Sequence, residues 1–142
     1  MKLKPDRKLR DRFFTPESSS HPAKGHLGLW WEILERYSKP GEWVLDPMAG
    51  VGATMLGALM GRNIICNEME HHFLLPMARS VTMMRQQPML GHDLGEMQIL
   101  WGDARDFNTW RPWPYTRLAQ AYPKLDFLQL KAIRRKQGWG QG

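Results

Sequence analysis

Hydrophobic residues recur through the middle of the chain with the two periods that distinguish helices from strands. In three stretches the apolar side chains lie three or four positions apart, which predicts amphipathic helices. Three shorter apolar runs, each followed by turn residues, are typical of strands. In chain order, the expected elements are a helix at 27–37, a strand at 43–45, a helix at 54–60, a strand at 63–67, a helix at 71–85 and a strand at 97–101. Strands that alternate with helices predict an α/β fold with a parallel sheet and right-handed crossovers.

The two ends of the chain lack this alternation. Residues 1–24 are rich in lysine and arginine and are interrupted by three prolines and a run of serines, so we expect a basic, extended arm. Residues 25–107 hold the expected elements and form the predicted α/β domain. Residues 108–142 end in a basic stretch that contains three glycines, and they are predicted to be an irregular basic tail.

Composition and charge restrict the partners of this domain. The chain has 142 residues and a formal net charge of +6, which favours an anionic partner such as nucleic acid. The single cysteine, Cys66, excludes an internal disulfide and has no C-x-x-C partner for a zinc site. No apolar run is long enough to cross a bilayer, and the basic N-terminus lacks the apolar stretch of a secretory signal, so we expect a cytoplasmic protein.

Acidic residues stand where the expected strands end. Asp46, Glu68 and Asp103 each follow an apolar run, and ligands of parallel sheets bind beyond the carboxyl ends of the strands. Gly50 and Gly52 form a loop after the first strand, and we expect their missing Cβ atoms to give a ligand room. An acidic residue at the end of the next strand, as Glu68 is, can accept hydrogen bonds from two ribose hydroxyls. This arrangement favours a cofactor that contains adenosine.

The glycine loop discriminates among such cofactors. The third glycine of a dinucleotide-binding loop is replaced by Met55, and no P-loop lysine follows Gly52. The segment 46–54, DPMAGVGAT, instead resembles the D-P-F-x-G-x-G-T-T loop of the amino-group DNA methyltransferases, which bind S-adenosylmethionine. Met48 replaces the usual aromatic residue of that loop, and Ala53 replaces the first hydroxyl residue.

The resemblance covers roughly residues 13 to 106. Gly61-Arg62-Asn63 and Glu68 resemble the second strand of the family, Gly102-Asp103-Ala104 resembles the end of its third strand, and residues 21–24, HPAK, resemble its H-P-x-K segment. The resemblance implies an incomplete, Rossmann-like parallel sheet, with Asp46 and the glycine loop near the methionine end of the cofactor, Glu68 on the ribose and Asp103 near the adenine amino group. The residues that it assigns to S-adenosylmethionine are His21, Lys24, Asp46, Pro47, Met48, Gly50, Gly52, Thr54, Glu68, Met69, Asp103 and Ala104.

The catalytic motif of that family is missing. Its members hold the target amine with a D/N/S-P-P-Y/F tetrapeptide, and the nearest string here, residues 111–115 (RPWPY), has the wrong spacing and is interpreted as a proline-rich turn. We therefore expect the S-adenosylmethionine-binding part of an N4-cytosine or N6-adenine DNA methyltransferase. Such a chain needs another segment or subunit for catalysis, and an exposed last strand would favour pairing with a partner subunit or a second copy.

Other interpretations remain open. The chain could belong to an RNA methyltransferase, or it could be a non-catalytic remnant that binds nucleic acid or regulates another protein. His71 and His72, with His92, lack the spacing of a metal site, so we expect no metal and interpret them as histidines on a helix surface. Trp30, Trp43 and Trp101 are expected to pack in the core.

Overall fold

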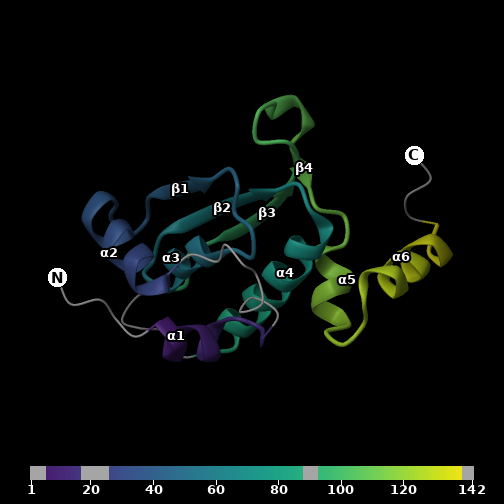
Figure 1. Ribbon diagram of the computed structural model, residues 1–142, viewed down its shortest axis with the longest axis horizontal. Coiled ribbons are helices and arrows are strands. Elements are labelled where there is room, and N and C mark those ends of the chain that lie inside the picture. Colours follow the sequence, from purple (N-terminus) through teal and green to yellow (C-terminus); the bar gives the residue numbers. More distant parts are fainter. Residues whose placement is uncertain (1–5, 17–25, 88–92, 139–142) are drawn as a thin grey trace.

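The chain folds around a small, mixed sheet, described here in a computed structural model that covers residues 6–16, 26–87 and 93–138. The strands are β1 (Trp43–Asp46), β2 (Asn63–Glu68), β3 (Met97–Trp101) and β4 (Arg111–Pro112), in the order β1-β2-β3-β4. β1, β2 and β3 are parallel to one another, and β4 is antiparallel to β3 (Figure 1). The prediction of an α/β fold is confirmed, and a parallel three-stranded core is compatible with part of a Rossmann-like sheet.

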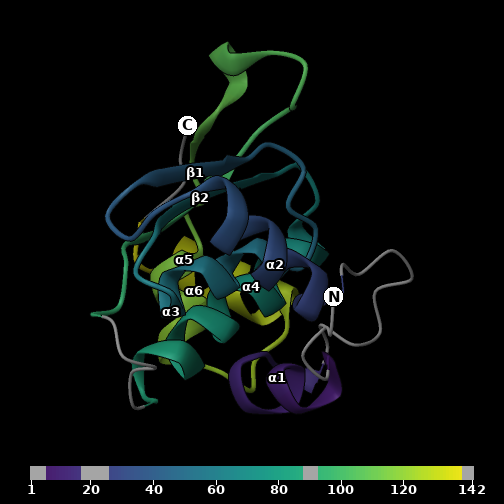
Figure 2. The ribbon, with the colours of Figure 1, turned by 90° about the vertical axis from the view of Figure 1, so that its left-hand side faces the viewer.

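The helices lie on one side of this sheet (Figure 2). α2 (Leu27–Tyr37), α3 (Leu56–Leu59) and α4 (His71–Arg85) connect or precede the parallel strands. The core lies between these helices and the inward side chains of the strands, among them the fully buried Ile64 and Cys66. None of the helices within the described ranges is long and apolar enough to span a membrane.

The predicted elements in the middle of the chain are all present. α2, α4 and β3 begin and end where the hydrophobic pattern places them, and Pro76 lies inside α4 without ending it. β1 and β2 each extend one residue further, to Asp46 and Glu68. The helix predicted at 54–60 is shorter and starts as the 3₁₀ turn η2 (Ala53–Met55) before α3.

The predictions for the two ends are wrong in part. α1 (Asp6–Phe13) forms within the expected extended arm, because Phe13 and Phe14 are buried in the core. The expected irregular tail contains α5 (Thr116–Ala121) and α6 (Phe127–Lys136), and a further 3₁₀ turn, η3 (Phe107–Thr109), precedes β4. Residues 111–115 are more than a turn, because Arg111 and Pro112 pair with β3 and Trp113 is only 2% exposed.

One face and one edge of the parallel sheet lie open within the described part of the chain. Trp43 is 52% exposed and Leu45 is 47% exposed, so the prediction that Trp43 packs in the core is wrong. Trp30 and Trp101 do pack against the core as expected. The exposed edge strand is β1, and the predicted exposure of the last parallel strand is also wrong, because β4 pairs with β3.

Arg62 is a buried cation that connects α2 to the start of β2. It is 5% exposed, and its guanidinium donates hydrogen bonds to the carbonyl oxygens of Met60 (2.8 Å), Leu34 (3.3 Å) and Ser38 (2.7 Å) and to Ser38 Oγ (2.9 Å). The carbonyl oxygens at the end of a helix have no partners within the helix. Arg62 supplies donors at this end of α2, where the helix dipole also favours a positive charge.

We expect Arg62→Met to lower the free energy of unfolding by about 2 to 4 kcal/mol, because it leaves buried carbonyl oxygens without donors. Urea denaturation of the purified chain measures this change. Arg36→Met is the matched control, because Arg36 is exposed in the last turn of the same helix; it should change the free energy by no more than about 0.5 kcal/mol. Equal effects of the two substitutions would contradict this role of Arg62.

Candidate functional site

The carboxyl ends of the three parallel strands are held together by Asn67. This side chain is fully buried, and its Nδ2 donates to the carbonyl oxygen of Pro47 (3.1 Å) after β1 and to that of Gly102 (3.0 Å) after β3. The backbone carbonyl of Asn67 also accepts a hydrogen bond from Ala49 N (2.9 Å). Asn67 was missed by the sequence analysis, because an asparagine within an apolar run carries no local signal of long-range contacts.

Asp46 closes the loop that follows β1. Its Oδ2 accepts a hydrogen bond from Thr54 Oγ1 at 2.8 Å, and its Oδ1 accepts one from Met48 N at 3.2 Å. Thr54 is buried, so this pair fixes the start of η2 against the end of the strand. The structure therefore brings Asp46 and Thr54 together, as two of the residues predicted to hold the cofactor.

Gly52 has a different role from the predicted one. Its φ is +85°, which disfavours any residue with a side chain. A Cβ atom at this position would lie 2.7 Å from Cγ of Met77 in α4. The space left by the missing side chain is therefore filled by the core, and the prediction that Gly52 leaves room for a ligand is wrong.

Glu68 connects the glycine loop to the end of β2. Its Oε1 accepts a hydrogen bond from Gly50 N at 3.0 Å, and its Oε2 accepts one each from Met69 N and Glu70 N at 2.7 Å. A carboxylate has about four acceptor positions. Three of them are used by backbone groups, so roughly one is left for a hydroxyl of a ligand, and a second hydroxyl would displace one of these N–H groups.

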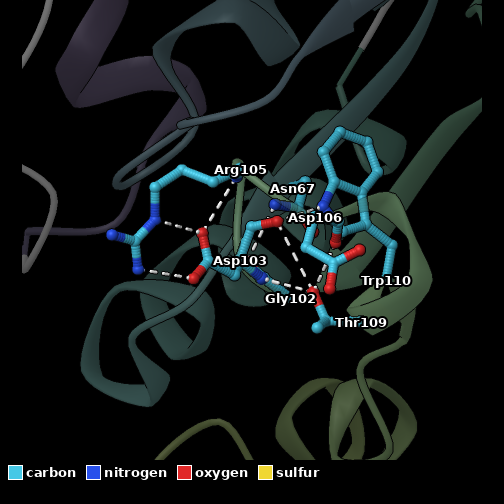
Figure 3. A network of polar contacts seen from close by, with 7 residues as sticks. All are labelled: Asn67, Gly102, Asp103, Arg105, Asp106, Thr109 and Trp110. Atoms are coloured by element: carbon cyan, nitrogen blue, oxygen red, sulfur yellow. Dashed lines mark hydrogen bonds and ion pairs between the residues drawn. The ribbon is translucent and has the colours of Figure 1, made fainter.

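Asp103, at the end of β3, is paired with Arg105 (Figure 3). The guanidinium donates to both carboxylate oxygens, with Nε to Oδ1 at 3.0 Å and Nη2 to Oδ2 at 2.7 Å. These hydrogen bonds lower the pKa of Asp103 to about 2. The Arg105 side chain is 85% exposed, so a ligand amine that bound Asp103 could displace it into solvent.

The backbone of the same segment is fixed by the residues that follow. Asp103 N donates to Thr109 Oγ1 (2.8 Å), and the Asp103 carbonyl oxygen accepts from Trp110 Nε1 (2.6 Å) (Figure 3). The backbone of the loop after β3 is therefore held against η3, while the carboxylate of Asp103 is accessible.

The other predicted cofactor residues are distributed around these three carboxylates. Met48 and Met69 are 75% and 53% exposed, Pro47 is exposed and Ala104 is half-buried. His21 and Lys24 lie outside the described residues.

A cavity of about 270 Å³ lies between α2 and β1, and its lining includes Asp46, Pro47 and Thr54 together with the apolar side chains of Trp30, Ile33 and Leu34.

Cys66, His71 and His72 are not among the residues predicted to hold the cofactor. Burial raises the pKa of the Cys66 thiol to about 12, with the Asp46 carboxylate adding to the shift. No group of histidine, cysteine, aspartate and glutamate residues suited to a metal ion occurs within the residues that the structure describes. His72 is exposed as predicted, but His71 is half-buried among aromatic rings, so its assignment to a helix surface is wrong.

Comparison with known proteins supports the methyltransferase resemblance over part of the chain. A stretch of 46 residues, 32% of this chain, is 46% identical to the type II methyltransferase M.MthZI of Methanothermobacter thermautotrophicus. The chain is methyltransferase-like over this stretch. The match spans 13% of the length of that relative. No family model matches the chain, and no solved structure matches it significantly.

We expect Cys66 to be inert toward thiol reagents in the folded chain. The thiolate is the reactive form, and a pKa of about 12 leaves almost none of it at pH 8. Iodoacetamide labelling followed by mass spectrometry should show modification only after unfolding in urea. Rapid labelling under native conditions would contradict the burial of this thiol.

Proposed function

We propose that this chain is the S-adenosylmethionine-binding part of an amino-group DNA methyltransferase, which modifies N4 of cytosine or N6 of adenine. The proposal depends most on the hydrogen bond between Glu68 and Gly50 N, because it joins the glycine loop of the first strand to the acidic end of the second. The similarity to a type II methyltransferase supports the same reaction class. Bound S-adenosylmethionine would supply an electrophilic methyl group on a sulfonium.

The residues at the strand ends fit this cofactor. Glu68 has an acceptor position left for a ribose hydroxyl, and the exposed side chain of Met69 beside it offers an apolar surface for the adenine ring. Asp103 could accept a hydrogen bond from the adenine amino group when Arg105 moves away. The cavity between α2 and β1, next to Asp46, has room for the methionine part.

The chain needs a further segment or subunit for methyl transfer. The D/N/S-P-P-Y/F tetrapeptide that would hold the target amine is absent, and residues 111–115 contribute a strand pair and a buried tryptophan instead. Parallel strands are usually covered on both faces. The open edge of β1 and the exposed Trp43 and Leu45 therefore favour a partner subunit, a second copy or another part of a longer protein at this position.

Calorimetric titration with S-adenosylmethionine tests the cofactor site. We expect micromolar binding, and Glu68→Gln should weaken it by about tenfold or more, because a hydrogen bond to a charged group is lost. Glu96→Gln is the matched control: Glu96 is exposed at the amino end of β3 and should not affect binding. A folded wild-type chain that does not bind would contradict the proposal and favour a non-catalytic remnant.

We expect no methyl transfer from the isolated chain, because its sequence lacks the D/N/S-P-P-Y/F tetrapeptide that would hold and align the target amine. The measurement is incorporation of labelled methyl groups into double-stranded DNA, and into RNA as a second substrate, with the Glu68→Gln chain as background. Incorporation into either substrate by the wild-type chain would contradict the need for another segment, and the preferred substrate would distinguish a DNA from an RNA methyltransferase.

A further inference from the structure

A large pocket lies beside the candidate cofactor site, between the end of β3, β4 and the helices α4 and α6. Its volume is about 710 Å³, which is within the range of ligand-binding pockets. Four rings line it: His71, Trp101, Tyr115 and Phe127. Three cations also line it: Arg111, Lys131 and Arg134. We refer to this group of seven residues as the aromatic-cationic pocket.

Each cation of the pocket lies over an aromatic ring. The Arg111 guanidinium is 4.2 Å from the ring centroid of Trp101, Arg134 is 5.2 Å from that of Tyr115, and the Lys131 ammonium is 5.5 Å from that of Phe127. These cation-π contacts hold the charges at the surface of the pocket. A planar guanidinium stacked on a tryptophan also offers a flat surface on which a further ring can stack.

The positive charge of the pocket is not neutralised locally. Within the described ranges, none of the three cations forms an ion pair with a carboxylate, and no acidic residue lines the pocket. Three like charges around one cavity raise the local concentration of anions. The pocket is thus suited to a ligand that combines an aromatic ring with a negative charge.

His71 adds a neutral hydrogen-bond donor. Its Nδ1 accepts a hydrogen bond from Trp113 Nε1 at 3.0 Å, and burial together with the nearby Lys131 lowers its pKa. In the neutral ring that accepts at Nδ1, the proton is on Nε2. Stacking of His71 on Phe127, with ring centroids 4.5 Å apart, fixes the ring in the wall of the pocket.

The pocket adjoins the residues assigned to the cofactor. Trp101 Nε1 donates a hydrogen bond to the carbonyl oxygen of Met69 at 3.1 Å, and Met69 follows Glu68 directly. α5 and α6 lie next to α4 (Figure 1), and α6 contributes Phe127, Lys131 and Arg134 to the lining of the pocket. A ligand in the pocket would therefore lie next to the turn that Glu68 organises.

We propose that the aromatic-cationic pocket binds one nucleotide unit of a single nucleic-acid strand, with the base against the rings and its phosphate on Arg111 and Arg134. Stacking on aromatic side chains and phosphate contacts from cations are the two interactions by which single strands are bound without sequence readout. The inference rests on the proposed function, because the pocket would be the site at which that methyltransferase contacts nucleic acid. The residues of the pocket are not among those assigned to the cofactor.

Fluorescence anisotropy with a labelled oligothymidylate of about twelve nucleotides tests this site. The double variant Arg111→Gln/Arg134→Gln should bind about tenfold more weakly or worse. Its slope of log affinity against log salt concentration should be shallower by about 0.7, because the variant removes one phosphate contact and each such contact on a single strand contributes about 0.7. Tyr115→Leu should weaken binding by about fivefold or more and leave unchanged the binding of an abasic oligomer of the same length.

The matched control is Arg135→Gln/Lys136→Gln, which removes the same charge from exposed positions of α6 outside the pocket. It should weaken binding by less than about threefold. Thermal melts followed by circular dichroism confirm that each variant is folded. An equal loss in the control, or equal affinity for the abasic oligomer, would overturn the pocket as a nucleotide site. If thymidine 5′-monophosphate displaced the labelled oligothymidylate as well as unlabelled oligothymidylate does at the same concentration of nucleotide units, the pocket would bind a free nucleotide and not a strand.

Failure of this inference can be separated from failure of the proposed function. The variants in the pocket should titrate with S-adenosylmethionine as the wild type does, and Glu68→Gln should bind the oligothymidylate normally. A chain that binds the strand through this pocket but does not bind S-adenosylmethionine would support the pocket and contradict the proposed function.

Discussion

Two neighbouring side chains at the end of β2 hold the loops of three strands in place. Asn67 donates to the carbonyl oxygens of Pro47 and Gly102, and Glu68 accepts from the backbone of Gly50 and of the turn that begins α4. In a fully buried position, a carbonyl oxygen without a donor would cost about 1 to 3 kcal/mol. The positions of Asp46, the glycine loop and Asp103 all depend on these contacts, because β2 is the strand between the other two parallel strands.

The described helices cover one face of the sheet and leave the other face exposed (Figure 2). The helices of the described chain pack on a single face, so the side chains of β1 alternate between the core and solvent, with Trp43 and Leu45 outward. β4 pairs with β3 at the far edge, so within the described residues β1 is the parallel strand that has a neighbour on one side only. Large apolar side chains beside an unpaired strand are typical of a surface that another chain covers.

Sequence periodicity predicted the bounds of three elements that have several core positions, and it missed two helices that are held by few buried residues. α2, α4 and β3 have three or more inward apolar positions each, and their bounds were predicted correctly. α6 has one buried residue, Leu130, and α1 depends on Phe13 and Phe14 at its end, so neither gives a clear pattern among basic residues. The capping box of Asp126 and Gln129 was a local signal of α6 that could have been read.

The candidate site was predicted in position more than in detail. Strand ends and the order of acidic residues are local features, so Asp46, Glu68 and Asp103 were placed correctly at the ends of adjacent strands. Sequence patterns did not predict contacts between distant segments. Asn67 joins two loops, and the absent side chain of Gly52 makes room for Met77 of α4. The Arg105 pair on Asp103 is local in sequence, but a flexible, exposed arginine has no preferred partner until the loop is folded.

Residues 111–115 show how a segment without the expected motif can still contribute to the site. Pairing of Arg111 with Trp101 across β3 and β4 places the guanidinium over the indole, and burial of Trp113 supplies the hydrogen bond that fixes His71. The same indole of Trp101 donates a hydrogen bond to the carbonyl oxygen of Met69, next to Glu68. The short antiparallel strand β4 thus connects the aromatic-cationic pocket to the turn that is assigned to the cofactor. This connection gives the segment a structural role although it lacks the catalytic tetrapeptide.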